Sequence, residues 1–149
     1  MSEDFEERVR GDYRLSADPR LLDVGVIHRW LSSEAYWARG RSREEVERSI
    51  AHSNLYGVVH DSGELVACAR MVTDHVSFGW IGDVFVEASH RGRGLGGWMV
   101  GEIVDHWSAR GVRRIMLATR DAHQVYARVG FTALAHPERM MEIDRRTPF

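Results

Sequence analysis

The stretch that decides the fold is Arg91-Gly92-Arg93-Gly94-Leu95-Gly96-Gly97, called the glycine loop below. It follows a strand-like apolar segment at 77–86 and opens a segment with helical spacing that ends near Gly111. Glycines at four of its seven positions let the backbone turn without Cβ atoms blocking a close approach. Unpaired N–H groups and the dipole at a helix start bind phosphate, and the two arginines add positive charge. The stretch therefore predicts a phosphate-binding loop rather than a turn without a ligand.

The glycine loop also has the spacing G-x-G-x-x-G, which is typical of dinucleotide-binding folds. Two features weigh against that interpretation. Residues 87–90 separate the strand from the first glycine, whereas the dinucleotide turn is tight. Only 52 residues follow Gly97, too few for the remaining strands of a doubly wound sheet. A nicotinamide dinucleotide protein is therefore kept as a minor alternative.

Outward from the glycine loop, hydrophobic spacing and turn residues predict the remaining elements. Upstream, the expected elements are a strand at 13–17, a helix from Asp18 to Leu31, a helix opened by the capping box Ser42–Glu45, and a hairpin of strands 55–60 and 65–73. Downstream, they are a strand at 113–119, a short helix capped by Asp121 and ended by Gly130, and strands at 131–135 and 139–143. This order predicts an α/β (α+β) fold with a mixed, mostly antiparallel twisted sheet of about six or seven strands and about four flanking helices.

Length and composition limit the class of protein. The 149 residues predict a single domain spanning 1–149, with residues 1–12 as a charged, flexible lead-in. Apolar residues make up 44% of the chain, but no run approaches the roughly 18 residues that span a membrane. The acidic start lacks an apolar targeting segment, and the single cysteine, Cys68, excludes an internal disulfide. We therefore expect a cytoplasmic protein without membrane contact.

Charge narrows the expected ligands. The net charge of −2 gives no electrostatic footprint for nucleic acid. Residues 87–128 nevertheless carry seven arginines against four acidic residues, whereas the rest of the chain is net acidic. The basic segment 87–128 could bind a compact anion, and the acidic remainder of the chain could bind a cationic amine. The eight histidines show no metal-ligand spacing, so no metal is expected.

Three motifs in register resemble the GNAT superfamily of acyl-CoA-dependent N-acyltransferases. The glycine loop matches the family's pyrophosphate loop, and Asp83-Val84-Phe85-Val86 matches the strand that pairs with pantetheine. The segment 121–131 is similar to the family's second motif, a short helix that bears a tyrosine and ends in Gly-Phe. The order of elements from 53 to 143 also fits. Tyr36-Trp37 and Arg70–Asp74 are similar to a group of bacterial members.

The resemblance implies a GNAT fold and acetyl-CoA as the acyl donor. Loop amides would hold the pyrophosphate, strand backbone groups would pair with pantetheine, and the Val86 N–H would stabilise the oxyanion. Asp121 would contact the pantetheine arm, or only cap its helix. The expected donor-binding residues are Val84, Phe85, Val86, Arg91, Gly92, Arg93, Gly94, Leu95, Gly96, Gly97, Asp121 and Tyr126.

Two residues are predicted to be catalytic. Tyr126 is the expected general acid, because a phenol is protonated at neutral pH and can donate to the leaving sulfur; otherwise it is a tyrosine at the edge of the core. Asp83 lies among apolar residues, so it is expected to be either a desolvated base or a paired structural carboxylate. Glu87, His75 and Asp74 are further base candidates, and a water chain without a single essential base is another route.

The acceptor side is less defined. Tyr36, Trp37, Phe78 and Trp80 are predicted to line a cleft for an amine, or else to belong to the core. Cys68 is expected to be a buried apolar residue rather than a nucleophile. The predicted function is direct transfer of an acetyl group to a primary amine of a small molecule or peptide in a ternary complex; the alternative is a non-catalytic CoA-binding module. A homodimer is compatible with either function.

Overall fold

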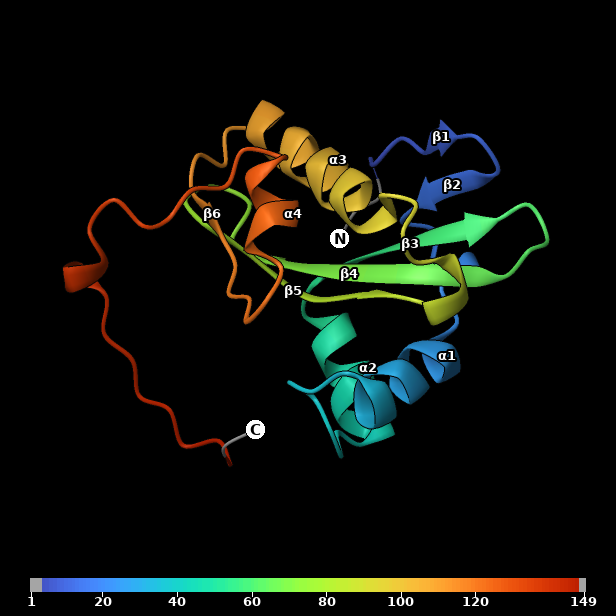
Figure 1. Ribbon diagram of the computed structural model, residues 1–149, viewed down its shortest axis with the longest axis horizontal. Helices are drawn as coiled ribbons and strands as arrows, with labels where there is room; N and C mark the ends of the chain where they lie inside the picture. The colour runs from blue at the N-terminus through green and yellow to red at the C-terminus, as the bar shows by residue number, and fades with distance from the viewer. Residues whose placement is uncertain (1–3, 148–149) are drawn as a thin grey trace.

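The computed structural model describes residues 4–147 and holds one six-stranded sheet between two layers of helices (Figure 1). Its strands are β1 (Arg8–Arg10), β2 (Tyr13–Ser16), β3 (Asn54–His60), β4 (Leu65–Thr73), β5 (Gly79–Val86) and β6 (Ile115–Met116), in that order across the sheet. Neighbours from β1 to β5 are antiparallel, and β6 runs parallel to β5. The predicted mixed, mostly antiparallel sheet is confirmed.

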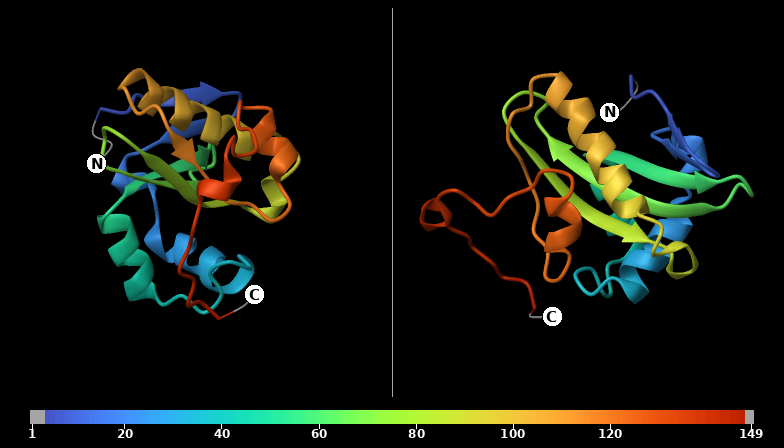
Figure 2. Two further views of the ribbon diagram at one scale, coloured as in Figure 1. Left: turned by 90° about the vertical axis from the view of Figure 1, so that its left-hand side faces the viewer. Right: turned by 45° about the horizontal axis from the view of Figure 1, so that its top comes forward.

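Helices cover both faces of the sheet, as the left view of Figure 2 shows. One face carries α3 (Leu95–Ala109) and α4 (His123–Ala127); the other carries α1 (Val24–Arg29) and α2 (Arg43–Ala51). Each layer buries its own apolar cluster. The α3 side includes Met99, Ile103 and Trp107 packed with Tyr56 and Val58, and the α1–α2 side includes Ile27, Trp30, Leu31 and Val46 packed with Cys68 and Phe85.

Elements whose start or end is marked by a capping or turn motif in the sequence form as predicted. The Ser42 side chain accepts from the Glu45 N–H and the Glu45 side chain accepts from the Ser42 N–H, so the predicted capping box opens α2. The hairpin β3–β4 closes through a short turn in which Gly63 has a positive φ. At the end of α3, Gly111 also has a positive φ, as the sequence predicts for a residue just past the helix.

The edge of β5 is the part of the sheet that positions the site. Strand β6 pairs only with Gly79 and Trp80, at the start of β5. Within residues 4–147, the stretch from Ile81 to Val86 therefore has a strand neighbour on the β4 side alone. The register between β4 and β5 also shifts there, and Asp83 takes a positive φ of 53° at the shift.

The N-terminal third differs from its prediction in two places. The expected helix from Asp18 to Leu31 is interrupted: a 3₁₀ turn covers Pro19–Leu21, and α1 begins at Val24. The Asp23 carboxylate accepts from two N–H groups of the new helix start, which explains the break. Within the expected flexible lead-in, Arg8–Arg10 forms β1 and Phe5 is buried.

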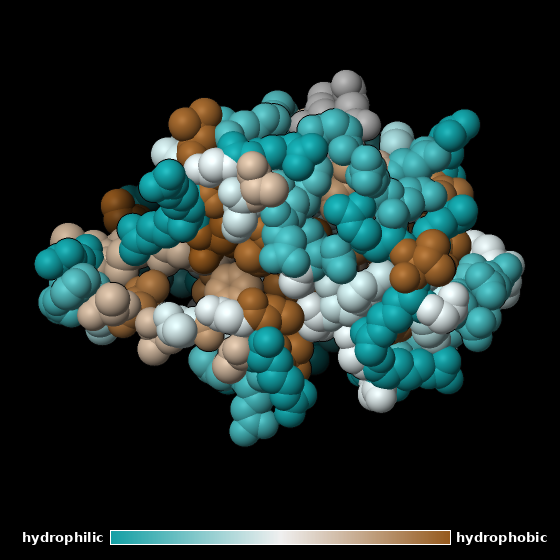
Figure 3. All heavy atoms as spheres, turned by 90° about the horizontal axis from the view of Figure 1, so that it is seen from above, coloured by the Kyte–Doolittle hydropathy of each residue, from teal (hydrophilic) through white to brown (hydrophobic). Residues whose placement is uncertain are grey.

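The C-terminal third differs more. The strand predicted at 113–119 contains only β6, and the strands predicted at 131–135 and 139–143 do not form within the described residues. A 3₁₀ turn, Pro137–Arg139, overlaps the start of the second predicted strand, and Met141 and Ile143 are 96% and 81% exposed. Seen from above, hydrophobic side chains gather toward the end of the molecule where this segment lies (Figure 3). Alternating apolar residues set a strand's faces, but a strand also needs a backbone partner.

The predicted cap of α4 is also wrong. Ala122, not Asp121, precedes the first helical residue, and its N–H donates to the Thr119 hydroxyl. The helix ends at Ala127, three residues before Gly130, which has a positive φ. Asp121 is thereby left exposed at the rim of the site described below.

The α2 capping box generates a stability prediction. Ser42→Ala should lower the free energy of unfolding by about 1 kcal/mol, because the Glu45 N–H loses its acceptor. Ser42→Asp should retain most of the stability, since aspartate caps helices equally well. Urea unfolding of the three proteins measures the difference, and equal midpoints for wild type and Ser42→Ala would contradict the role of the cap.

Candidate active site

The glycine loop has the backbone geometry that anion binding requires. Gly92 and Gly94 have left-handed φ values of 80° and 74°, and α3 begins at Leu95 without a side-chain cap. The first backbone bond of the helix runs from the Trp98 N–H to the Gly94 carbonyl. The N–H groups of the first helical turn therefore point out of the helix end, where the dipole is positive.

Three arginines surround this helix end. Arg93 donates to the Tyr13 hydroxyl at 2.6 Å, and Arg10 donates to the Gly94 carbonyl at 3.1 Å. Arg91 donates to the Val86 carbonyl at 2.8 Å, and its guanidinium lies 5.3 Å from the Phe85 ring centre. The sequence predicted Arg91 and Arg93 but missed Arg10, because it treated β1 as part of a flexible lead-in.

A cleft of about 620 Å³ lies along the open edge of β5. Its walls come from the loop before α2, from β4 and β5, from the segment between β6 and α4, from α4 itself and from the C-terminal segment. The lining residues are Tyr36, Trp37, Arg41, Arg70, Trp80, Ile81, Gly82, Asp83, Val84, Leu117, Ala118, Thr119, Arg120, Asp121, Ala122, Tyr126 and Arg146.

The cleft gathers most of the residues predicted to bind acceptor or catalyse transfer. Tyr36, Trp37 and Trp80 line it together with both predicted catalytic residues. Phe78 is not among the lining residues; it lies before the start of β5. The Phe85 side chain is buried in the apolar cluster beneath α1 and α2, where its ring stacks on Trp30 at 5.2 Å. Only the backbone of Phe85 remains available for its predicted role.

Asp83 is a fully paired carboxylate. One oxygen accepts from the Trp37 indole N–H at 2.9 Å, and the other accepts from Arg41 at 2.8 Å and from Arg70 at 3.0 Å. Burial raises the pKa of Asp83, but the Arg70 and Arg41 charges and these hydrogen bonds outweigh it, so the pKa lies below its usual value. Such a group is a weak base. The arrangement favours the paired structural carboxylate over the general base.

Tyr126 projects from α4 into the cleft and is half-buried. Burial, the neighbouring Tyr36 hydroxyl and the Asp121 carboxylate all raise the pKa of Tyr126 above its usual value. The phenol therefore stays protonated at neutral pH, which is the state a proton donor needs.

The other residues considered for chemistry lie elsewhere or are buried. The Cys68 thiol donates to the Asp83 carbonyl at 3.4 Å, and burial raises the pKa of the thiol well above its usual range. Asp74 accepts from the Ser77 hydroxyl and from backbone N–H groups of the β4–β5 turn, and these bonds hold the pKa of its carboxyl well below its usual range. His75, in the same turn, packs against Trp107.

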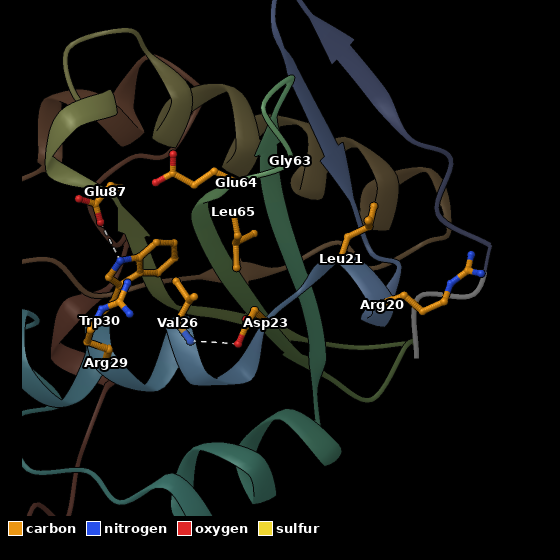
Figure 4. A pocket seen from close by; sticks show the side chains of 10 residues that line it. All are labelled: Arg20, Leu21, Asp23, Val26, Arg29, Trp30, Gly63, Glu64, Leu65 and Glu87. Atoms are coloured by element: carbon orange, nitrogen blue, oxygen red, sulfur yellow. Dashed lines mark hydrogen bonds between the residues drawn. The ribbon is translucent and has the colours of Figure 1, made fainter.

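Glu87 belongs to a second, smaller pocket of about 350 Å³ (Figure 4). There the Trp30 indole N–H donates to the Glu87 carboxylate at 2.8 Å, between α1 and the β3–β4 turn. Both acidic and basic side chains line this pocket, and it shares no lining residue with the larger cleft. Glu87 is therefore not placed to act on a substrate bound beside Tyr126.

Sequence reasoning missed the arginines of the cleft. Arg41 follows an aromatic loop, Arg70 lies in a buried strand, and the Arg120 guanidinium lies 3.7 Å from the Tyr36 ring centre. The one available signal was Arg70, a charged residue among the apolar residues of β4.

Within residues 4–147, no group of three or more histidine, cysteine or acidic residues is placed to hold a metal ion. In the same range, no helix is long and apolar enough to cross a membrane.

Known proteins resemble this chain both in sequence and in fold. The model of the acetyltransferase (GNAT) family matches residues 24–131. An inferred acetyltransferase of Gibberella zeae is 31% identical over 140 residues, which cover 80% of this chain and 78% of that protein. A solved structure of an inferred GNAT-family acetyltransferase from Xanthomonas campestris pv. campestris is 42% identical, with a TM-score of 0.82 over 89% of this chain and 92% of that chain.

A more distant solved structure shows the fold alone. This is a predicted acetyltransferase of Clostridium acetobutylicum, solved with acetyl-CoA, which is 20% identical to this chain. It has a TM-score of 0.64 and covers 89% of this chain and 94% of that chain.

The pairing of Asp83 generates a prediction on stability and pH. Asp83→Asn should lower the free energy of unfolding at pH 7 by on the order of 3 kcal/mol, because two partly buried guanidinium groups lose their counter-charge. Because the folded pKa is lowered, this contribution is present above about pH 4 and is lost as the pH falls through the folded pKa. The difference between the two proteins should therefore shrink in acid.

Urea unfolding at several pH values measures this difference. Asp144→Asn is the matched control: Asp144 pairs with Arg146 at the surface, so its loss should change stability far less. Equal stability of wild type and Asp83→Asn at pH 7, or a constant difference down to pH 2, would contradict the pairing.

Proposed function

Because this chain belongs to the GNAT family of acetyltransferases, we propose that it transfers an acetyl group from acetyl-CoA to a primary amine by direct attack in a ternary complex. The observation that carries the proposal is the open edge of β5, which lies between a glycine-loop helix start and a cleft containing a protonated tyrosine. The reaction needs a site for the donor, a site for the acceptor and a proton donor. The helix start and the open edge suit the donor, and the cleft with its tyrosine suits the acceptor and the proton transfer.

The chain's residues fit the donor at two points. The first-turn amides of α3, with Arg91 and Arg93, suit the negative pyrophosphate. An added Cβ at Gly92 would meet no atom within 4 Å, so the backbone there faces open space that a phosphate can approach. Along the strand, the Val86 carbonyl bonds to Arg91 rather than to another strand, so the Val86 backbone faces the open edge where pantetheine would pair.

Acetyl-CoA supplies an acetyl thioester; transfer forms a C–N bond to the amine and breaks the C–S bond. In the proposed reaction the Val86 N–H stabilises the developing oxyanion, because a backbone donor is fixed in place beforehand. The Tyr126 hydroxyl donates its proton to the departing sulfur. The amine's proton passes to water in the open cleft, since Asp83, the buried carboxylate of the cleft lining, is held by two arginines. Asp83 then acts as a positioning residue for Arg41 and Arg70.

The glycine loop gives a binding prediction with a matched control. Gly94→Ala should weaken acetyl-CoA binding at least tenfold, because a methyl group on this left-handed residue would lie 3.3 Å from the Arg10 guanidinium and disturb the helix end that is proposed to bind phosphate. Gly111→Ala places the same substitution at a left-handed residue just past the other end of α3, and should cost stability without changing affinity. Calorimetric titration of both variants with acetyl-CoA, and with NADP as the competing ligand class, measures the effect.

Two results of that titration would contradict the assignment of the loop. One is equal acetyl-CoA affinity of Gly94→Ala and Gly111→Ala. The other is binding of NADP in preference to acetyl-CoA, which would assign the same loop to a dinucleotide.

Tyr126 gives a catalytic prediction. Tyr126→Phe should lower turnover at least tenfold, because general acid catalysis typically contributes a hundredfold or more. Acetyl-CoA affinity should stay within about twofold, since the ring remains. Thiol release with a panel of primary amines measures turnover, and calorimetry measures binding. Turnover equal to wild type would remove Tyr126 from the reaction. Acetyl-CoA binding with no turnover by the wild type on any amine would favour the non-catalytic CoA-binding module.

A further inference from the structure

Positive charge is the feature of the cleft that acetyl transfer alone does not explain. Four arginines line the cleft, against the two carboxylates of Asp83 and Asp121. One of the four, Arg146, pairs with Asp144 outside the lining. The remaining three still exceed the two carboxylates by one charge.

The excess is concentrated around Asp83. Its single negative charge is shared by Arg41 and Arg70, so the group of three carries a net charge of +1. The side chains of Arg41 and Arg70 are only 23% and 18% exposed, so water screens this charge poorly. A partly buried net charge is costly until an opposite charge joins it.

Both guanidinium groups retain donors for such a charge. Arg41 donates to Asp83 through Nη1, and Arg70 donates to Asp83 through Nε and to the Ser53 hydroxyl through Nη1. Within residues 4–147, each group therefore has further N–H donors beside the cleft. A planar guanidinium fork matches a carboxylate with two parallel hydrogen bonds. Asp83 already shows that a carboxylate fits between these two side chains.

The rest of the wall suits the body of such a ligand. Trp37 and Trp80 face the same cleft and offer ring surface to an aliphatic or aromatic body. A third guanidinium, that of Arg120, lies against Tyr36 in the same wall. A polycation would meet net repulsion there.

We propose that the acceptor is an amine that also carries a carboxylate, and that Arg41 and Arg70 bind this carboxylate while the amine lies toward Tyr126. The proposal rests on the proposed function, because it assigns the acceptor of the same site.

The test compares amine pairs that differ only in this charge. L-phenylalanine with L-phenylalaninamide, and β-alanine with β-alaninamide, are titrated into the protein saturated with CoA; spermidine represents the polycations. At least one carboxylate should bind at least tenfold more tightly than its amide and more tightly than spermidine. Equal affinity within every pair, tighter binding of the amides or of spermidine, or binding of none of the five would overturn the proposal.

Two variants locate the effect. Arg41→Gln should weaken binding of the preferred carboxylate at least tenfold and leave its amide and CoA unchanged. Arg39→Gln removes the same charge from the same loop, but Arg39 is exposed and does not line the cleft, so carboxylate affinity should not change. Equal effects of the two substitutions would show that the preference reflects overall charge and would overturn the assigned site.

Failure of the proposed function can be distinguished from failure of the carboxylate-bearing acceptor. Failure of the proposed function would appear as absent CoA binding, or as no thiol release with any amine. A protein that binds CoA and acetylates amides or polyamines preferentially would keep the proposed function and lose only the carboxylate-bearing acceptor.

Discussion

The structure depends on one unpaired strand edge. Strand β6 is two residues long, so the backbone of β5 from Ile81 to Val86 has no strand beside it on that side within residues 4–147. Backbone N–H and C=O groups need partners, and an exposed edge would also recruit other strands. The chain uses part of this edge itself, through the bond from Arg91 to the Val86 carbonyl, and the rest opens into the cleft. The edge thus leaves backbone groups without a strand partner, and it is the place where we propose that the donor pairs.

The bulge in β5 connects this edge to the acceptor side. Asp83 has a left-handed φ of 53°, a conformation that costs a non-glycine residue of order 1 kcal/mol or more. Three hydrogen bonds to its carboxylate offset that cost; the two from Trp37 and Arg41 tie the loop before α2 to the sheet, and the one from Arg70 joins β4 to β5. The same contacts orient Arg41 and Arg70 toward the cleft and deprive Asp83 of basicity. The Asp83 carboxylate therefore holds the bulge in β5 and the loop before α2 in place, and it also determines the net charge of this part of the cleft.

The sequence predicted best where the signals are local. The glycine loop, the Ser42 capping box and the β3–β4 hairpin each carry their information within a few residues, and all three form as expected. The strands expected at 131–135 and 139–143 failed because alternation does not provide a pairing partner.

The sequence identified the loop that we propose for the donor, and it identified only part of the cleft that we propose for the acceptor. A loop motif identifies residues 91–97, whereas the pairing of Asp83 with Arg41 and Arg70 brings together residues 42 and 13 positions apart. The sequence could state both interpretations of Asp83, as base or as paired carboxylate. Choosing between them required the tertiary contacts.

Amide hydrogen exchange with and without CoA tests the central claim most directly. If the open edge and the glycine loop bind the donor, CoA should slow exchange at the amides of Leu95, Gly96 and Gly97, and at the edge-facing amide of Val86. The amide of Glu87, which already donates to the Val66 carbonyl, serves as an internal reference and should change little. Protection at the loop without the edge, or at neither, would contradict the account.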